Sequence, residues 1–270
     1  MRNNAAVWAI VRNELRRRKL YLLWWSVGII ALVGLTVLAY GSVRDQAAEL
    51  NKAFGSLSSS ISSFVGTGDM FSPAGYLNSQ LYFITLPILF ILLSVTLSSS
   101  LLNKEESRHT LELLLARPVS RSGVLAAKAI SGSIIVAILG AVTAITVALC
   151  ALAVHIDIPI GYILLTSLAM LLFSGAFGAL AFMLFAASQV TRRLAVVVAI
   201  LVSFGGYILT SLAGMVHGLA WVAKLFPYHY YDPGAILTGK LSAGLVLYIA
   251  AIYIGAMVVA TIGFRRRDIQ

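Results

Sequence analysis

Residues 80–121 read QLYFITLPILFILLSVTLSSSLLNKEESRHTLELLLARPVSR, and the character of the chain changes abruptly within them. The first part, 80–102, has no charged residue and is long enough to cross the ~30 Å hydrocarbon core of a bilayer as a helix. The second part, 104–121, mixes Lys, Glu and Arg with leucine until Pro118 interrupts it. The stretch therefore predicts a membrane span that leads directly into an exposed, charged helix.

Apolar stretches of this kind recur along the whole chain. Hydrophobic residues make up 60% of the 270 residues and charged residues only 11%, against about 25% charged in a soluble domain. Six stretches have the length of a span, at about 20–40, 80–102, 124–154, 160–187, 194–216 and 241–264. We therefore expect an all-α polytopic membrane protein, with a six-span transmembrane domain over residues 20–270. The third and fourth stretches exceed the minimum length, so tilt or extension beyond the hydrocarbon is expected.

The basic residues predict which side each end of a span faces. With Lys128 assigned to the loop between spans two and three, 16 of the 20 Lys and Arg residues fall in the terminal segments and in loops two and four. Basic residues concentrate on the cytoplasmic side, so both termini are expected in the cytoplasm. The same distribution accounts for the net charge of +10, and nucleic acid is not expected as a partner.

Residues 1–19 are expected to form a cytoplasmic interfacial amphipathic helix. Val7, Trp8, Val11 and Leu15 fall on one side at helical spacing, and arginines lie mostly on the other. Such a helix lies in the plane of the interface, with its basic residues toward anionic lipid. The predicted membrane-interface residues are Trp8, Arg16, Arg17 and Arg18. The alternative is a disordered basic tail that only fixes the topology.

Two external loops have patterns of their own. Apolar residues recur every three or four positions between 50 and 64, which predicts an amphipathic helix. The turn-rich residues 66–76 then lead into the second span. The loop 218–240 is rich in tyrosine and also contains Trp221 and two prolines. It is interpreted either as an aromatic belt at the membrane interface or as a pair of short, half-inserted helices.

The sequence shows no catalytic, cofactor or metal motif. Residues 234–240 match most of a P-loop, but Leu241 stands where the metal-binding hydroxyl is needed and no strand precedes them. The four histidines are scattered. The interiors of the spans are read as free of Asp, Glu, Lys and Arg, which argues against a secondary carrier with its own ion coupling. Small residues at 174, 175, 178 and 179 predict a close helix contact with an unnamed partner.

The charged segment after the second span has the spacing of an exposed helix. Glu105, Arg108 and Glu112 are placed to form i,i+3 and i,i+4 ion pairs, and Leu111, Leu114 and Leu115 form the opposite stripe. An apolar ridge flanked by charges fits the groove of a soluble protein. The alternative is a helix that rests on lipid, which three glutamates beside an anionic leaflet disfavour.

Two runs in the sequence resemble the permease subunits of type-2 ABC exporters. The first is Glu105-Glu106 followed by Thr110 through Arg121, which is similar to the family's loop between spans two and three. The second is residues 71–81, before the second span. The six-span layout, the N-terminal interface helix and the short helices before the last span are also similar.

The resemblance implies a permease that is not itself an enzyme and that pairs with a separate ATPase. Two permease copies, expected to be a homodimer, and two ABC ATPase subunits would form one transporter in a prokaryotic inner membrane, with ATP and Mg on the ATPase. The implied coupling surface, with the ion-paired residues above, consists of Glu105, Glu106, Arg108, Leu111, Glu112, Leu113, Leu114 and Arg117. The expected cargo is an amphipathic drug-like molecule, a peptide or a related substrate.

Three other functions are left open at this stage. The first is a non-exporting immunity or sensor subunit of the same architecture. The second is a secondary carrier, including one for sodium-related efflux. The third is a membrane-embedded enzyme, which would need a buried nucleophile and base that the sequence does not offer. ATPase-dependent accumulation of substrate in vesicles would separate an exporter from the immunity or sensor subunit, and transport without any ATPase partner would favour the secondary carrier.

Overall fold

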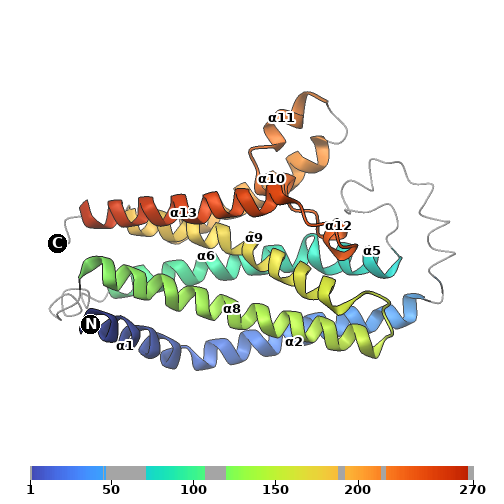
Figure 1. Cartoon of the computed structure of the whole chain (residues 1–270), viewed down its shortest axis with the longest axis horizontal. Helices are drawn as coiled ribbons and strands as arrows, with labels where there is room; N and C mark the ends of the chain where they lie inside the picture. The colour runs from blue at the N-terminus through green and yellow to red at the C-terminus, as the bar shows by residue number, and fades with distance from the viewer. Residues whose placement is uncertain are drawn as a thin grey trace.

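The computed structural model describes residues 2–44, 46, 71–106, 120–187, 192–213 and 217–266. All regular structure within these ranges is helical. Six helical segments are long and apolar enough to span a membrane, and they confirm the predicted number. They are Lys19–Ser42, Pro73–Leu102, Ser122–Ala153, Ile160–Ala187, Val196–Ala213 and Ala243–Phe264. One end of this bundle contains the first residues of helices α1 and α8 and the last residues of helices α6 and α13 (Figure 1). We name it the α1 end.

The first two helices are joined almost without interruption. Helix α1 covers Arg2–Arg17 and helix α2 covers Lys19–Arg44, with Arg18 as the single residue between them. Helix α1 packs along helix α8, and α2 packs along the same helix farther from the α1 end. The helix expected within residues 1–19 is therefore present.

The second span begins earlier than the sequence suggested. Helix α5 covers Pro73–Leu77, a π-helical turn η1 covers Asn78–Tyr82, and helix α6 covers Thr85–Glu106. The side chain of Ser72 accepts a hydrogen bond from the amide of Gly75 at 3.1 Å, and Pro73 occupies the first turn. Serine before proline is a strong helix start, so the expectation of a turn up to residue 76 and a span from residue 80 was wrong. The amphipathic helix expected within 50–64 lies outside the described residues.

Helices α8 and α9 form a long antiparallel pair. Helix α8 covers Arg121–Ala153 and is capped by Ser120, and helix α9 covers Ile160–Ala187. At 1.5 Å per residue α8 measures about 50 Å and α9 about 42 Å, and both exceed the hydrocarbon thickness, as expected. The turn between the two helices places His155 at a positive φ of 56°.

The last third of the chain contains helix α10, Arg192–Ala213, and helix α13, Ala243–Arg266. Between them lie four short pieces: η2 His217–Leu219, α11 Ala220–Ala223, η3 Pro227–His229 and α12 Pro233–Leu237. Trp221 is 69% exposed, as in a belt, but Tyr228 and Tyr231 are buried in the core. The loop is therefore a set of short helical turns anchored by tyrosines, and a belt alone does not describe it.

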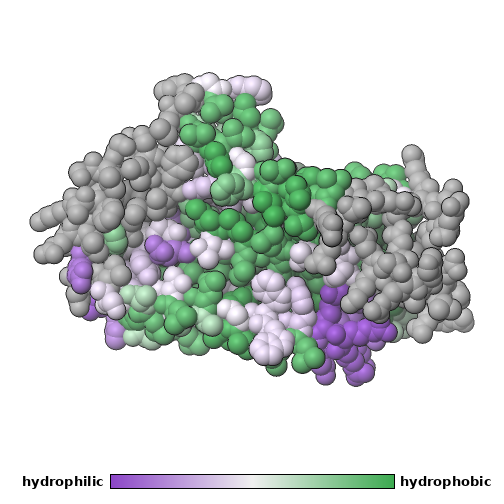
Figure 2. Space-filling model, turned by 180° about the vertical axis from the view of Figure 1, so that it is seen from behind, coloured by the Kyte–Doolittle hydropathy of each residue, from purple (hydrophilic) through white to green (hydrophobic). Residues whose placement is uncertain are grey.

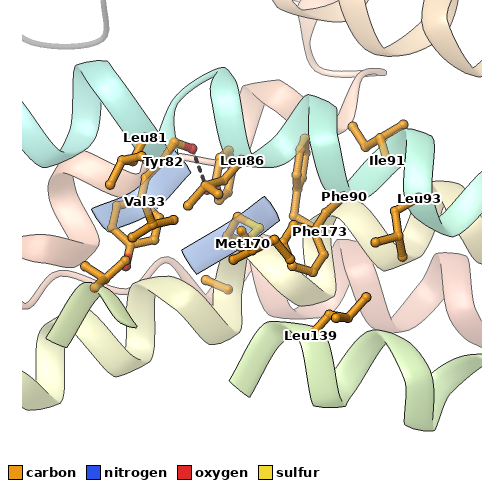
Figure 3. Packing of buried hydrophobic residues seen from close by; sticks show 14 of the residues in the cluster. Val33, Leu81, Tyr82, Leu86, Phe90, Ile91, Leu93, Leu139, Met170 and Phe173 are labelled. Carbon is orange, nitrogen blue, oxygen red and sulfur yellow. Dashed lines mark hydrogen bonds between the residues drawn. The ribbon is translucent and has the colours of Figure 1, made fainter. Parts of the chain in front are cut away.

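Helix α9 lies at the centre of the bundle and packs against α6 on one side and α13 on the other. Its glycines identify the partners that the small-residue pattern left open. A Cβ on Gly178 would lie 2.6 Å from the Cβ of Ser94 in α6, and a Cβ on Gly175 would meet the Tyr253 hydroxyl of α13. Apolar side chains of α2, η1, α6, α8 and α9 fill the adjoining core (Figure 3).

The outer surface of the helices is broadly apolar. Leu35 in α2, Leu201 in α10 and Leu247 in α13 are each at least 66% exposed. Figure 2 shows this apolar surface across the middle of the molecule and a hydrophilic cluster over α1. The distribution is that of a protein whose sides face lipid and whose ends face water.

Candidate functional site

The candidate site is the α1 end of the bundle, where the predicted coupling segment is attached. Helix α6 ends at Glu106 and helix α8 begins at Arg121, so two helices that enter the core carry the segment between them. The backbones of Glu105 and Glu106 lie in the last turn of α6. The remaining predicted coupling residues lie outside the described part of the chain: Arg108, Leu111, Glu112, Leu113, Leu114 and Arg117. Their contacts stay predictions.

The predicted membrane-interface residues of α1 and its junction with α2 differ in their exposure. Trp8 is 60% exposed, and Arg16 and Arg17 are also exposed. Arg18 instead lies against the bundle, with only 15% of its side chain exposed. The exposed face is available to the membrane interface, while Arg18 takes part in contacts within the protein.

These contacts form a charged cluster that joins three helices. The Lys128 Nζ of α8 lies 2.6 Å from the Glu14 Oε1 of α1. The Arg18 Nε lies 3.3 Å from Glu14 Oε2. The same guanidinium donates to the Ser100 hydroxyl of α6 at 2.8 Å and to the Ser100 carbonyl at 3.3 Å. We call these four residues, Glu14, Arg18, Ser100 and Lys128, the α1 clamp.

The α1 clamp holds charge away from water. Glu14 is 7% exposed and Lys128 is 2% exposed. Burial alone raises the pKa of a carboxyl group and is the largest single influence on Glu14. The contacts with Lys128 and Arg18 more than offset it, so the pKa of Glu14 lies below its ordinary value. Glu14 is therefore ionised at neutral pH and attracts both cations.

Sequence reasoning missed this cluster. Lys128 was assigned to the second loop, and the spans were read as free of charge. In the structure Lys128 lies inside α8, within the third span. Glu14 falls on the same helix face as Val7 and Val11, because it lies seven positions after the first and three after the second. An acid in the apolar stripe of one helix and a lysine in the apolar run of another each need a partner when buried, and this was the available signal.

A second polar cluster lies in the opposite half of the bundle, among aromatic rings. The Tyr82 hydroxyl and the Ser167 hydroxyl are 2.7 Å apart, and the Tyr231 hydroxyl donates to the Tyr82 carbonyl at 2.8 Å. The ring of Tyr231 stacks on Phe173 with centroids 4.3 Å apart. Burial raises the pKa of Tyr231 well above its ordinary value, so its hydroxyl keeps its proton and remains a donor. These contacts fix the short turns 227–237 to η1 and α9.

The same half of the molecule contains a small open pocket of about 230 Å³ between α12 and the start of α13, with Asp232 and Lys240 in its lining. Ligand sites for drug-sized molecules usually measure about 300–1,000 Å³, so this pocket is too small for one. The pocket therefore does not identify a cargo.

The P-loop-like residues 234–240 form the end of a helix. Asp232 caps α12 by accepting from the amide of Ala235 at 3.0 Å. Gly239 has a φ of 87°, and the amide of Lys240 donates back to the Ala235 carbonyl at 2.9 Å. This is the left-handed glycine termination of a helix, and its amides point back into α12. Within the described ranges, no three His, Cys, Asp or Glu side chains are grouped to hold a metal.

Comparison with known protein families identifies a match over most of the chain. The family described as ABC-2 family transporter protein matches residues 8–229, which include the part of α1 from Trp8 onward, the α1 clamp and five of the six spans. No individual curated protein matches the chain. Since the match covers most of the chain, the protein belongs to the ABC-2 family and is the membrane component, or permease subunit, of an ABC transporter.

Proposed function

We propose that this permease exports an amphipathic molecule, such as a drug-like compound or a peptide, and that residues 104–117 receive the driving force from a separate ABC ATPase. ATP and Mg bind to that partner. Two copies of the permease and two of the ATPase form the transporter in a prokaryotic inner membrane. Family membership supports the ATPase partner, and the charged, leucine-ridged sequence supports the docking segment.

The observation that carries this proposal is the way the segment is attached. Helix α6 runs from the core to Glu106, and helix α8 runs from Arg121 back into the core. Both helices pack on the central helix α9. A displacement of the segment is therefore applied to two of the helices that surround α9. Because packed cores switch between discrete arrangements and do not deform continuously, such a displacement can move the bundle between two states.

The charges inside the bundle support an external source of energy. Among the described residues of the six spans, Lys128 is the buried ionisable group that carries a charge, and Glu14 neutralises it from α1. Ion-coupled carriers usually place an ionisable residue on the substrate pathway. Both members of this ion pair belong to the protein and lie at the α1 end, so the pair does not resemble the pathway residue of an ion-coupled carrier, and this supports ATP on the partner as the source of free energy.

The proposal is tested by reversing two charges of the segment. We expect Glu105→Lys with Glu106→Lys to abolish copurification with the ABC ATPase or to abolish the effect of the permease on its ATP hydrolysis. The matched control reverses two basic residues at the opposite end, Lys224→Glu with Lys240→Glu, and should retain both properties. Normal copurification and normal ATP hydrolysis with the first variant would overturn the proposed coupling surface.

A further inference from the structure

The α1 clamp lies close to both attachment points of the coupling segment. Ser100 is six residues before the end of α6, and Lys128 is seven residues after the start of α8. At 1.5 Å per residue these separations are about 9–11 Å along each helix. A displacement of the segment that moves the adjoining ends of α6 and α8 therefore reaches the clamp residues within about two helical turns.

The clamp attaches α1 to both of these helices at once. Lys128 holds Glu14 to α8, and Arg18 joins Glu14 to the hydroxyl and the carbonyl of Ser100 in α6. The Lys128–Glu14 contact, at 2.6 Å, has the short distance typical of a strong charge-assisted hydrogen bond. Val11, which is 2% exposed on the same face of α1, adds an apolar contact one turn away. Helix α1 is thus fixed to the bundle by charge as well as by its apolar face.

Helix α1 also leads directly into a span. Only Arg18 separates it from α2, and the Arg18 amide donates to the Leu15 carbonyl at 3.2 Å across the junction. A movement of α1 is therefore passed to the inner end of α2. We infer that the α1 clamp makes α1 a moving part of the transporter, which carries displacement of the coupling segment from α6 and α8 into α2.

This inference rests on the proposed function, because it assumes that an ATPase displaces the segment. It assigns Glu14 and Lys128 as positioning residues for energy coupling. If the Glu14–Lys128 ion pair is purely structural, it stabilises α1 equally in every nucleotide state of the ATPase. If the pair transmits movement from α8 to α1, the stability of α1 changes with the nucleotide bound to the ATPase.

The difference is measurable by amide hydrogen exchange on the complex of the chain with its copurifying ABC ATPase. Exchange is compared in residues 10–18 and 121–130, without nucleotide and with ADP, Mg and vanadate trapped. In the native complex, trapping should change the exchange rate in both segments. In Lys128→Gln the response of 121–130 should remain, while that of 10–18 should fall at least threefold.

Two further variants keep the test decisive. Glu14→Gln with Lys128→Gln removes both of the most buried charges, and Arg18 keeps its hydrogen bonds to Ser100 and partial exposure to water. The double variant should therefore fold if Lys128→Gln does not, and it should show the same loss. Arg12→Gln removes an exposed positive charge from the same helix and should respond like the native chain.

Two results would overturn the inference while leaving the proposed function intact. One is a native response in 121–130 with none in 10–18. The other is a full response of 10–18 in the clamp variants. A native complex in which neither segment responds to trapping would overturn the proposed function and this inference with it.

Discussion

The contact between α6 and α9 offers the sharpest stability test, through Gly178→Ala. The new Cβ would lie 2.6 Å from the Cβ of Ser94, whereas carbon atoms in contact settle at roughly 3.5–4.0 Å. The two helices must therefore separate by about 1 Å. Ser94 offers no rotation that relieves the contact, because its Cβ is fixed to the α6 backbone.

The magnitude follows from three contributions. Overpacking of this kind costs about 1–3 kcal/mol. The Ser98 hydroxyl donates to the Gly178 carbonyl at 2.9 Å, and weakening such an interhelical bond in a membrane costs on average about 0.6 kcal/mol. Alanine regains up to about 1 kcal/mol of helix propensity. The net expectation is a loss of about 0.5–2.5 kcal/mol in the free energy of unfolding.

The assay is reversible unfolding in mixed micelles, with Gly255→Ala as the matched control. A Cβ on Gly255 in α13 would meet nothing within 4 Å, so this variant should be as stable as the native chain or slightly more stable. Equal stability of the Gly178 and Gly255 variants would refute the packing of α9 against α6 described above.

The remaining predictions concern the two polar clusters. Lys128→Gln should lower the free energy of unfolding by up to about 3 kcal/mol, because it leaves Glu14 buried with Arg18 as its remaining ion-pair partner. Adding Glu14→Gln to this variant should recover part of the lost free energy in the same unfolding assay. The pKa of Glu14 lies below 4.5, so the ion pair should stabilise the protein fully at neutral pH and be lost as the pH falls through the folded-state value. The stability difference between the native chain and Glu14→Gln should therefore shrink below about pH 4.5, and a constant difference would contradict this. Tyr231→Phe should cost about 1 kcal/mol through the hydrogen bond to the Tyr82 carbonyl, whereas Tyr231→Ala should cost about 3–5 kcal/mol because it also removes the stacked ring from Phe173.

The fold was predictable because the bilayer imposes one requirement on every span. Each must be a long apolar helix that satisfies its own backbone, and this pattern is local in sequence. The six spans were identified on this basis, and the helix before the first span was identified from the helical spacing of its apolar residues. The error at the second span came from reading Ser72-Pro73 as a turn, although the same dipeptide starts a helix when its side chain caps the first turn.

The α1 clamp was not predicted because it depends on contacts between distant segments. Glu14 and Lys128 are 114 positions apart, and each looks ordinary alone, one in an arginine-rich helix and the other near a basic loop. Tyr228 and Tyr231 were likewise ambiguous, since aromatic residues near a membrane surface serve equally as a belt or as core. The buried side chains of Tyr228 and Tyr231 identify them as core residues, and their burial depends on how α6, α9 and α10 pack against one another.

The proposed function requires an ABC ATPase to contact the segment between α6 and α8. A photo-crosslinking amino acid placed at Leu114 measures this contact, in membranes that contain the chain and its ATPase, with Leu247 as a control position. Leu247 is 71% exposed on α13, near the end opposite the α1 end. The proposed function predicts an adduct between position 114 and the ATPase, and none with the ATPase from position 247. Adducts of position 114 with phospholipid alone would contradict it.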